Sequence, residues 1–554
     1  MDLSNKLKNF KILFENKEYD QIIDEINKIE KKDSKILNIY GAAFLLRNNK
    51  KKRDKISALK SFEKAYLIDK KTLNGLNALC NFINIGLELG KFSKIFEYYE
   101  DAKSFFGEDE KLLEVIQRAY LFQNNVIKRD KILKKLIDKK SQSVKIWSSY
   151  FYNKNFLSEI KSQKYHFDLV KGFENLLINF NLPNINLNKN IRKRKIKIAF
   201  LSSDLNNNHS VTYFLKGLLQ NIDKSKFHIT AIANWRSNEF SNKQISPYFD
   251  HWFSINKYRD LEAIKLIRSQ CFDVIFDIMG MTSDNRPTLF KNRIAPVQIN
   301  WLGYCNTTGI KNMDFIFSDK NLIDKKEERF YFEKVKKFKN IWNCHSGYPF
   351  KRKLTLEPPL KQKKFTYGSF NNFNKISNEN LNCWEKILKQ NTQSQLVIKT
   401  STGYPSVFVK EELRRRGIIK QVTILEKSNS YLDHLNLYDK IDIALDTFPY
   451  TGVTTTFDSL WKNVPVLTLK GYNFKSRCGY SIIKNLNIDY LVANNTDEYV
   501  SKALYLSKDK DYLKSLRKEL FIKLANSKLF DTKSFAVEFQ NLLMECIEEK
   551  LQSS

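Results

Sequence analysis

The spacing of apolar residues divides the chain into a helical first third and a mixed remainder. Through residues 1 to about 180, apolar side chains recur every three or four positions and proline and glycine are rare, which predicts one helix after another. The segment Pro183–Lys197 is polar and then basic, and we interpret it as a linker. Beyond it, short apolar runs alternate with helix-like segments, which predicts parallel sheets covered by helices.

A weak repeat is visible within the helical part. Helices with one apolar face start near Tyr19, Lys55 and Phe92, at intervals of roughly 36 residues, which is close to the length of a tetratricopeptide repeat. The clearest unit is Ser57–Asp69, which is similar to the second helix of such a repeat. We therefore predict a tetratricopeptide-like helical repeat region over residues 1–182, with a generic helical bundle as the alternative.

Two α/β units of similar size follow the linker, so that the fold class is α + α/β. The first unit is predicted over residues 195–355, with strands that include Lys197–Ser202, Phe227–Ala233 and Asp273–Met279. The second is predicted over residues 360–554 and ends in about 55 helical residues. Its expected strands are Phe365–Ser369, Gln395–Lys399, Gln421–Leu425, Ile441–Leu445 and Pro465–Leu469. This alternation predicts a doubly wound parallel sheet in each unit.

Composition supports a folded protein of several domains. The 554 residues correspond to about three domains, and 42% hydrophobic with 13% aromatic residues argues against disorder. The net charge of +33 favours an acidic partner such as nucleic acid, anionic lipid or a phosphorylated substrate. Because the lysines are scattered, we favour the interpretation that the positive charge is spread over solvated faces and does not mark a specific acidic partner. Such a charge still attracts anionic substrates in general.

Cysteine usage and the N-terminal sequence indicate a cytoplasmic protein. The seven cysteines form no CxxC pair, and no His/Cys cluster has metal-ligand spacing, as expected in a reducing compartment. The first residues carry charges inside their apolar stretch, unlike a signal peptide. No stretch approaches the roughly 18 apolar residues of a spanning helix, so we expect no membrane span.

One strand–loop–helix segment has the pattern of a phosphate site. The strand Ile441–Leu445 leads through a loop to a helix start with three hydroxyls, Thr454, Thr455 and Thr456, and then to Asp458. A helix N-terminus offers unpaired N–H groups and a partial positive charge, which suit a phosphate when they follow a parallel strand. Asp458 is a candidate acceptor for a ribose hydroxyl, as acidic residues are in nucleotide sites. An ordinary N-cap at Thr454 is the alternative.

Five stretches in a fixed order carry a family resemblance. They are HSVTYFL at His209, NRIAPVQINWLGYCNTTG at Asn292, FNNFNKI at Phe370, LDTFPYTGVTTTFDSLWKNVPVLTL at Leu445 and SRCG at Ser476. Over most of residues 195–540 the chain resembles the family 41 glycosyltransferases, the O-linked N-acetylglucosamine transferases with their plant SPINDLY-type and bacterial relatives. The resemblance implies the GT-B architecture, in which two Rossmann-like units flank a crevice and helical repeats precede them.

The resemblance assigns the donor-binding residues. The family lysine of the FNNFNK motif binds the diphosphate, which implies that Lys375 stabilises the departing nucleotide. Asn371 and Asn372 of the same motif are implied to bind the donor, and so is His434, against the nucleotide base. The three threonines and Asp458 complete the implied donor site.

Histidines are the implied proton carriers, because their ordinary pKa lies near neutrality. His209 matches a family histidine beside the acceptor, and Asp204 would match a family aspartate. Four residues separate Asp204 from His209, however, where the family usually has three. His166 resembles a histidine on the last helix before the catalytic region, which faces the active site in the family.

Three positions depart from the family pattern. Asn372 stands where the family usually has glutamine, and Val453 stands where a histidine often precedes the threonines. Tyr431 falls near the lysine that reads uridine in animal enzymes. Tyr431 leaves the nucleotide open, since SPINDLY-type relatives use a GDP sugar.

The resemblance predicts an inverting, metal-independent protein O-glycosyltransferase that needs no cofactor. The expected donor is UDP-N-acetylglucosamine, and the acceptor is a Ser or Thr of a protein bound through the helical repeats. Alternatives that stay open are an Asn-linked hexosyltransferase using UDP-glucose, a GDP-fucose-dependent O-fucosyltransferase and a non-catalytic repeat scaffold. A nucleic-acid-binding protein is suggested by charge alone and predicts a steep fall of affinity with salt; we expect no specific nucleic acid partner.

Overall fold

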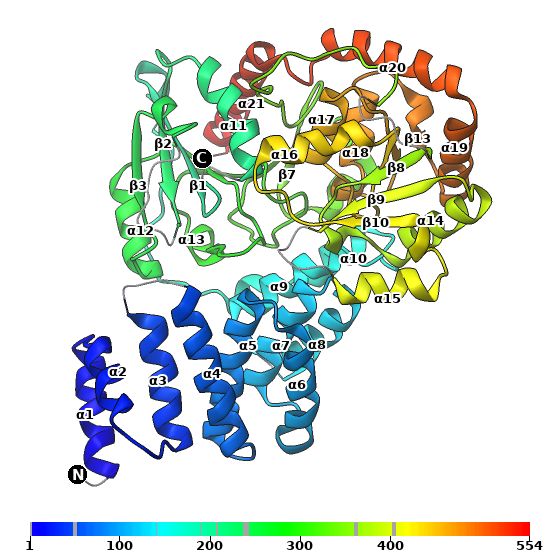
Figure 1. The fold of residues 1–554 in the computed structure, drawn as a ribbon. Helices are drawn as coiled ribbons and strands as arrows, with labels where there is room; N and C mark the ends of the chain where they lie inside the picture. The colour runs from blue at the N-terminus through cyan, green and yellow to red at the C-terminus, as the bar shows by residue number, and fades with distance from the viewer. Residues whose placement is uncertain are drawn as a thin grey trace. The chain divides into compact units, whose positions relative to one another are not determined.

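The chain folds into two compact units. The computed structural model describes residues 3–47, 52–139, 141–188, 190–205, 209–235, 243–358, 364–400 and 406–553. One unit comprises Met1–Ser141 with Thr402–Phe408, and the other comprises Gln142–Ser401 with Val409–Ser554 (Figure 1). The domain limits predicted at residues 182, 195, 355 and 360 stay predictions, since both sheets belong to one compact unit.

The first unit is built from helix pairs. Its helices are α1 (Leu3–Glu15), α2 (Tyr19–Asn27), α3 (Ser34–Leu46), α4 (Lys52–Ile68), α5 (Leu73–Glu88), α6 (Phe92–Phe106), α7 (Glu110–Phe122) and α8 (Val126–Asp138). Neighbours in sequence pack together, as α3 does on α4 and α7 on α8. The predicted starts at Tyr19 and Phe92 coincide with the starts of α2 and α6, whereas Lys55 lies inside α4. The pairing fits the predicted tetratricopeptide-like repeats.

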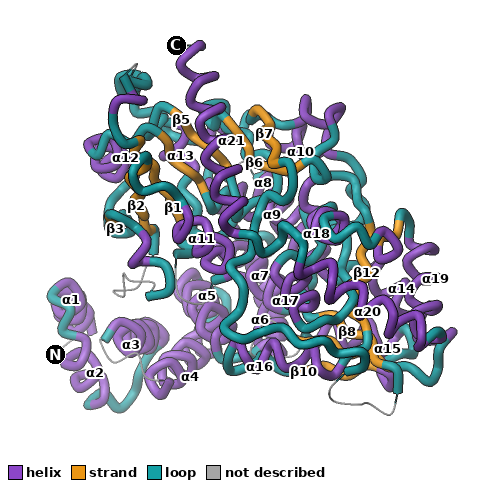
Figure 2. Tube along the Cα trace, turned by 90° about the horizontal axis from the view of Figure 1, so that it is seen from above, coloured by secondary structure: helices purple, strands orange, loops and turns teal. Residues whose placement is uncertain are grey.

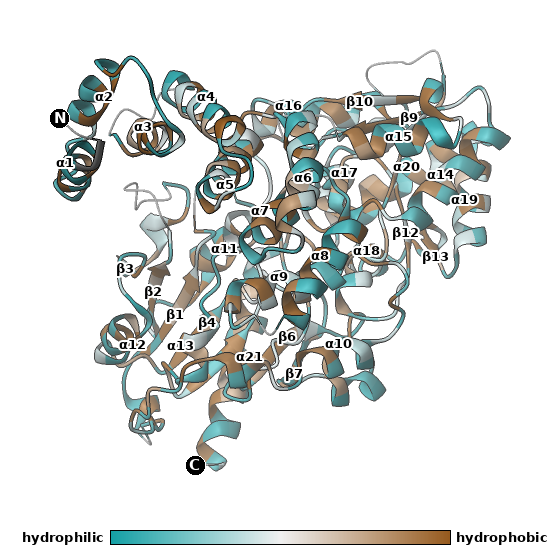
Figure 3. Cartoon of the chain, turned by 90° about the horizontal axis from the view of Figure 1, so that it is seen from below, coloured by the Kyte–Doolittle hydropathy of each residue, from teal (hydrophilic) through white to brown (hydrophobic). Residues whose placement is uncertain are grey.

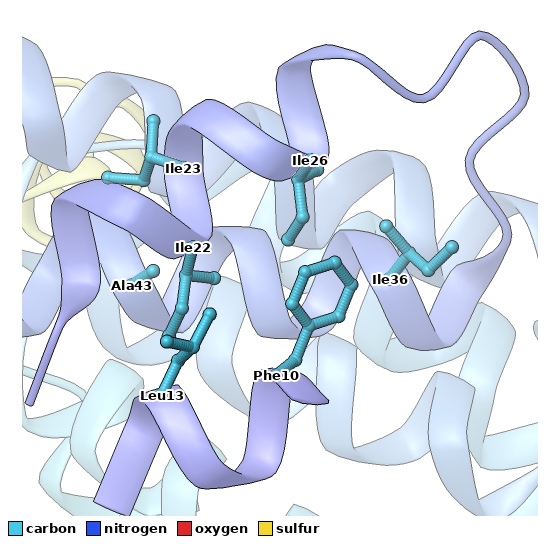
Figure 4. Close-up of a cluster of buried hydrophobic side chains, with 7 residues drawn as sticks. All are labelled: Phe10, Leu13, Ile22, Ile23, Ile26, Ile36 and Ala43. Atoms are coloured by element: carbon cyan, nitrogen blue, oxygen red, sulfur yellow. The ribbon is translucent and has the colours of Figure 1, made fainter. Parts of the chain in front are cut away.

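The core of the first three helices follows their apolar spacing. Ile22 and Ile26 lie one turn apart on α2 and therefore share one face. That face meets apolar side chains of α1 and α3 (Figure 4). The buried cluster consists of Phe10, Leu13, Ile22, Ile23, Ile26, Ile36 and Ala43. Packing of these apolar faces against one another stabilises short helices that would be only marginally stable in isolation.

The second unit contains two all-parallel sheets, as predicted. The first sheet has the strand order β3-β2-β1-β4-β5-β6-β7, and the second has the order β10-β9-β8-β11-β12-β13. The first comprises β1 (Ile196–Ser202), β2 (Phe227–Ala233), β3 (His251–Ser254), β4 (Val274–Asp277), β5 (Val297–Asn300), β6 (Phe315–Asp319) and β7 (Lys334–Phe338). The second comprises β8 (Thr366–Ser369), β9 (Gln395–Lys399), β10 (Val422–Leu425), β11 (Ile443–Leu445), β12 (Val466–Leu469) and β13 (Val492–Ala493). These two Rossmann-like sheets after a helical region confirm the predicted architecture.

Among the shortened strands, the predicted strand Asp273–Met279 loses the most residues. The run Asp273–Met279 yields only β4, Val274–Asp277. The Asp277 carboxylate accepts hydrogen bonds from the backbone N–H groups of Met279 and Gly280, at 2.9 and 3.0 Å. This local turn bends the chain out of the sheet and ends the strand.

Helices cover both faces of the sheets (Figure 2). The remaining helices of the chain are α9 (Val144–Lys154), α10 (Gln163–Val170), α11 (Ser210–Asn221), α12 (Asp260–Ser269), α13 (Pro287–Lys291), α14 (Asn378–Gln390), α15 (Val407–Arg415), α16 (Tyr431–Asn436), α17 (Thr454–Trp461), α18 (Cys478–Lys484), α19 (Thr496–Lys508), α20 (Lys510–Ala525) and α21 (Thr532–Gln552). The last helix, α21, returns to the first sheet and packs on α11, β5 and β7 (red in Figure 1). Among the described residues, no helix combines the length and low polarity needed to cross a bilayer.

Both sheets reverse their strand order at one point, between β1 and β4 and between β8 and β11. The strands there are apolar and buried, and β1 and β2 are drawn largely in brown in Figure 3. Ligands of open parallel sheets bind beyond the carboxyl ends of the strands at such a reversal. The loops after β1, β8 and β11 are therefore where a functional site is expected.

Candidate functional site

Asp446 organises the loop after β11. Its Oδ1 accepts hydrogen bonds from Asn371 Nδ2 (3.2 Å), Thr447 N (2.8 Å) and Gly452 N (2.7 Å). Its Oδ2 accepts from Thr468 Oγ1 at 2.7 Å. Burial raises the pKa of Asp446, and these hydrogen bonds oppose that rise. Since Asn371 follows β8, the carboxylate ties together the two strand ends where the order reverses.

Two glycines let the backbone approach this carboxylate. A Cβ at Gly452 would lie 2.7 Å from Thr455 Oγ1 and 3.0 Å from Asp446 Oδ1. A Cβ at Gly479 would lie 2.3 Å from Asp446 Oδ2. These distances are shorter than a van der Waals contact, so the close packing of the loop depends on glycine at both positions.

Helix α17 starts without a side-chain cap. Val453 is the N-cap residue and makes no side-chain hydrogen bond, which excludes the alternative of an ordinary cap by Thr454. Thr455 Oγ1 donates to Asn371 Oδ1 at 2.8 Å, and Thr456 is buried. The first N–H groups of α17 thus keep the positive end of the helix dipole open to an anion.

Lys375 lies at the same strand edge. It ends a 3-10 turn, Phe373–Lys375, and its Nζ donates to the carbonyl of Thr451 at 2.9 Å. The Nζ also lies 4.2 Å from the ring centroid of Tyr450. Burial lowers the pKa of Lys375, and the nearby Asp446 acts in the opposite direction. Lys375 therefore offers a positive charge held in a fixed position.

A cavity of about 300 Å³ joins the two sheets at this edge. Six predicted site residues line it: His209, Asn371, Asn372, Lys375, Thr454 and Thr455. The wall between them includes Leu302, Gly303, Cys305, Trp342, Asn343 and Tyr450. The structure thus brings the predicted phosphate end and His209 together. Within the described residues, no group of three or more His, Cys, Asp or Glu side chains is arranged to hold a metal ion.

His209 and Asp204 lie on the side of the first sheet. His209 is the N-cap of α11, where its Nδ1 accepts from Val211 N at 3.4 Å. Its Nε2 lies 3.7 Å from Asp204 Oδ1. Burial raises the pKa of Asp204, and His209 opposes that rise. Three of the four residues between them, 206–208, lie outside the described residues.

His166 is buried apart from this cavity. It is 2% exposed, and its Nε2 lies 3.1 Å from Tyr472 Oη and 3.2 Å from Lys475 Nζ. Burial first, and then the charges of Lys475 and Lys154, hold its pKa well below the usual value. His166 is not among the cavity-lining residues, so its predicted catalytic role stays a prediction.

The buried Asp458 and the half-buried His434 form a second group that does not line the cavity. Asp458 Oδ1 accepts from Tyr348 Oη (2.6 Å) and Tyr431 Oη (2.5 Å), and its Oδ2 lies 3.3 Å from His434 Nε2. The protein itself thus occupies both oxygens that were predicted to meet a ribose. His434 Nδ1 lies 2.7 Å from Lys399 Nζ, and burial lowers the pKa of Lys399 to about 8.

Tyr213, Tyr348 and Lys399 were missed in the sequence, whereas Tyr431 was noted there as a departure from the family pattern. Tyr431 stacks on Tyr213 with ring centroids 4.7 Å apart and an angle of 16°, and on Tyr348 at 6.2 Å. No sequence spacing relates these three tyrosines, since they come from α11, a loop and α16. Lys399 could have been identified from the sequence, because it ends the predicted strand Gln395–Lys399 at the edge of the sheet where the site is expected.

His345 gives this region a pH-dependent stability. Its ring stacks on Tyr348 and Phe457, with centroids 4.6 and 5.5 Å apart, and burial lowers its pKa from 6.5 to about 4. Between pH 6.5 and 4 the unfolded state therefore takes up this proton first, so the free energy of unfolding falls as pH falls. We expect His345→Gln to remove about 2–3 kcal/mol of that fall, measured by urea unfolding at several pH values.

The exposed His251 provides the control for this experiment. His251→Gln makes the same substitution at a surface position and measures the effect of the exchange itself. An identical pH dependence in the parent chain and in His345→Gln would contradict the neutral, buried state of His345.

Comparisons with known proteins identify the family of the chain. The model of glycosyl transferase family 41 matches residues 132–343 and 357–539. A Solanum lycopersicum protein named probable UDP-N-acetylglucosamine–peptide N-acetylglucosaminyltransferase SPINDLY is 29% identical over 64% of the chain. Its Arabidopsis thaliana counterpart is 30% identical over 63%. The chain spans 39% of the length of each of these plant proteins.

A solved structure shares the fold. A mutant of the Thermobaculum terrenum O-GlcNAc transferase superposes with a TM-score of 0.82 and 22% identity, covering 94% of the chain and 98% of that protein. At this identity the likeness establishes the fold alone. The family model, by contrast, covers more than half of the chain and includes every residue of the cavity wall. The chain belongs to glycosyl transferase family 41.

Proposed function

We propose that the chain is a protein O-glycosyltransferase that transfers a sugar from a nucleotide sugar to Ser or Thr. One observation carries the proposal: Lys375 and the uncapped start of α17 line one wall of a cavity whose other wall carries His209. UDP-N-acetylglucosamine is the proposed donor, which agrees with the names of the plant relatives.

The arrangement supports a single displacement with inversion. The acceptor hydroxyl oxygen forms the new bond to the anomeric carbon, while the bond from that carbon to the diphosphate oxygen breaks. The charge of the leaving diphosphate is stabilised by Lys375 and by the N–H groups at Thr454 and Thr455. The hydroxyl proton passes to His209, and Asp204 stabilises the imidazolium that forms. Lys375 and the dipole of α17 stabilise the charge that a metal ion would otherwise stabilise. We therefore propose that the reaction needs no metal ion.

The helical repeats are the proposed binding surface for the protein acceptor. Stacked helix pairs present extended surfaces that suit an extended polypeptide. We propose a cytoplasmic location, from cysteine usage alone. A GDP sugar is the second candidate donor, because Tyr431 is stacked between Tyr213 and Tyr348 and is no cation.

A panel of nucleotide sugars tests the proposal. Calorimetry with UDP-N-acetylglucosamine, UDP-glucose and GDP-fucose identifies the donor, and mass spectrometry of co-expressed proteins locates the modified residues. We expect binding of one donor at micromolar to millimolar affinity and new sugar on Ser or Thr. If no nucleotide sugar binds, the proposal is wrong, and modification of Asn alone would favour the Asn-linked alternative.

His209→Asn separates acceptor chemistry from donor binding. Asparagine is also a good N-cap, so α11 keeps its cap while the titratable ring is lost. We expect kcat to fall by about 10²–10⁴-fold, with the affinity for the donor unchanged, because a proton acceptor acts only in the transfer step. A variant with full kcat would remove His209 from the mechanism.

A further inference from the structure

We propose that Trp342 and Asn343 recognise the transferred sugar through polar atoms that the protein leaves unpaired. The inference rests on the proposed function and names the residues that read the sugar. Both residues line the cavity, and each is 1% exposed. Among the described residues, neither Trp342 Nε1 nor Asn343 Oδ1 has a hydrogen-bond partner.

Unpaired buried polar atoms are rare in folded proteins, and each costs free energy. A ligand in the cavity that supplies the missing hydrogen-bond partners removes this free-energy cost and is bound more tightly as a result. Trp342 Nε1 is a donor only, whereas the side-chain amide of Asn343 offers an acceptor and a donor. The pair therefore fits a group that both accepts and donates, such as a sugar hydroxyl or an acetamido group.

The backbone of this segment is fixed, as a recognition element requires. Trp301 Nε1 donates to the carbonyl of Trp342 at 2.9 Å, and Trp342 N donates to Asp319 Oδ2 at 3.2 Å. The indole packs edge to face on Phe474, with ring centroids 5.8 Å apart. The position of the Trp342 indole is thus set before a ligand binds.

The place of the two residues in the cavity indicates which part of the donor they meet. Lys375 and Thr454 mark the diphosphate, and His209 marks the acceptor oxygen. The anomeric carbon lies between these groups during a displacement, so the sugar ring must occupy the space between them. Trp342 and Asn343 line that same cavity and follow the first sheet, not the nucleotide-binding sheet.

The test compares nucleotides with and without a sugar. Trp342→Phe removes only the indole N–H and its ring edge, and Asn343→Ala removes the amide. For each variant, calorimetry measures affinity for UDP, UDP-N-acetylglucosamine and UDP-glucose, and for GDP and GDP-fucose if the parent binds guanine nucleotides. We expect affinity for the donor sugar nucleotide to fall about tenfold, and that for the bare diphosphate to stay the same.

The comparison of UDP-N-acetylglucosamine with UDP-glucose identifies the group of the sugar that is recognised. A loss for UDP-N-acetylglucosamine but not for UDP-glucose assigns the acetamido group, and an equal loss for both assigns hydroxyls; either result supports the inference. Trp252→Phe is the matched control, because Trp252 Nε1 is also buried and unpaired but lies on β3, away from the cavity lining. It is expected to bind every ligand as the parent does.

Two outcomes overturn the inference alone. One is unchanged affinity for the sugar nucleotide in both variants, and the other is an equal loss for the sugar nucleotide and the bare diphosphate. In both cases Lys375→Ala is still expected to weaken nucleotide binding, so the proposed function stands. A parent chain that binds no nucleotide sugar overturns the proposed function and the inference together.

Discussion

Lys375→Ala is expected to lower the rate of sugar transfer by about 10²–10³-fold and to weaken binding of the nucleotide diphosphate. The Lys375 ammonium is held by the carbonyl of Thr451 and the ring of Tyr450, beside the open N-terminus of α17. Its charge is therefore available where negative charge grows as the diphosphate leaves. Calorimetry with UDP and a transfer assay measure the two effects.

Lys351→Ala is the control for this experiment, because Lys351 is an exposed lysine of the same chain. In a protein of net charge +33, the control separates a local role from a general loss of positive charge. Equal effects of the two substitutions would mean that Lys375 acts only through the overall field, and the proposed mechanism would fail.

Asp446→Ala is expected to lower the free energy of unfolding by about 3–5 kcal/mol. The substitution leaves four buried donors without their acceptor: Asn371 Nδ2, Thr447 N, Gly452 N and Thr468 Oγ1. The loop that leads to α17 depends on them, so nucleotide binding is expected to fall as well. Equilibrium urea unfolding and calorimetry with UDP provide the two measurements.

Two variants sharpen this test. Asp446→Asn keeps one oxygen as an acceptor, and its cost is expected to be smaller, about 1–2 kcal/mol. Asp439→Ala removes an aspartate whose ion pair with Lys462 (2.8 Å) is partly solvated, which is expected to cost under about 1 kcal/mol. If Asp446→Ala costs no more than Asp439→Ala, the carboxylate does not organise the loop.

The clustering of the residues proposed to bind phosphate was predictable, because these residues are close in sequence to recognisable strand ends. Lys375 follows a predicted strand by a short motif, and Thr454 and Thr455 open a helix after another. Parallel strands place their carboxyl ends on one edge, so a correct strand assignment brings these residues together. The six predicted residues that line the cavity all lie in such loops or helix starts.

The remainder of the site was not predictable in this way. The predicted ribose contact of Asp458 stays a prediction, and two tyrosines from distant segments donate to its Oδ1. The predicted place of His166 in the active site also stays a prediction, and its side chain is buried against Tyr472 and Lys475. In each case the partner comes from a segment with no fixed spacing to the residue, so the contact is decided by how the elements pack.

The sequence by itself determined the order of the elements, the two parallel sheets and the strand edge at which the site lies. These features depend on local periodicity and on the chirality of strand connections, which act over short stretches of chain. Only the tertiary structure decided that Val453 leaves α17 uncapped, that Asp446 binds both strand ends, and that Trp342 and Asn343 enter the cavity with unpaired polar atoms. The physical reason is that burial and hydrogen-bond satisfaction are properties of the packed chain: a polar atom has a partner or lacks one only when distant segments have met.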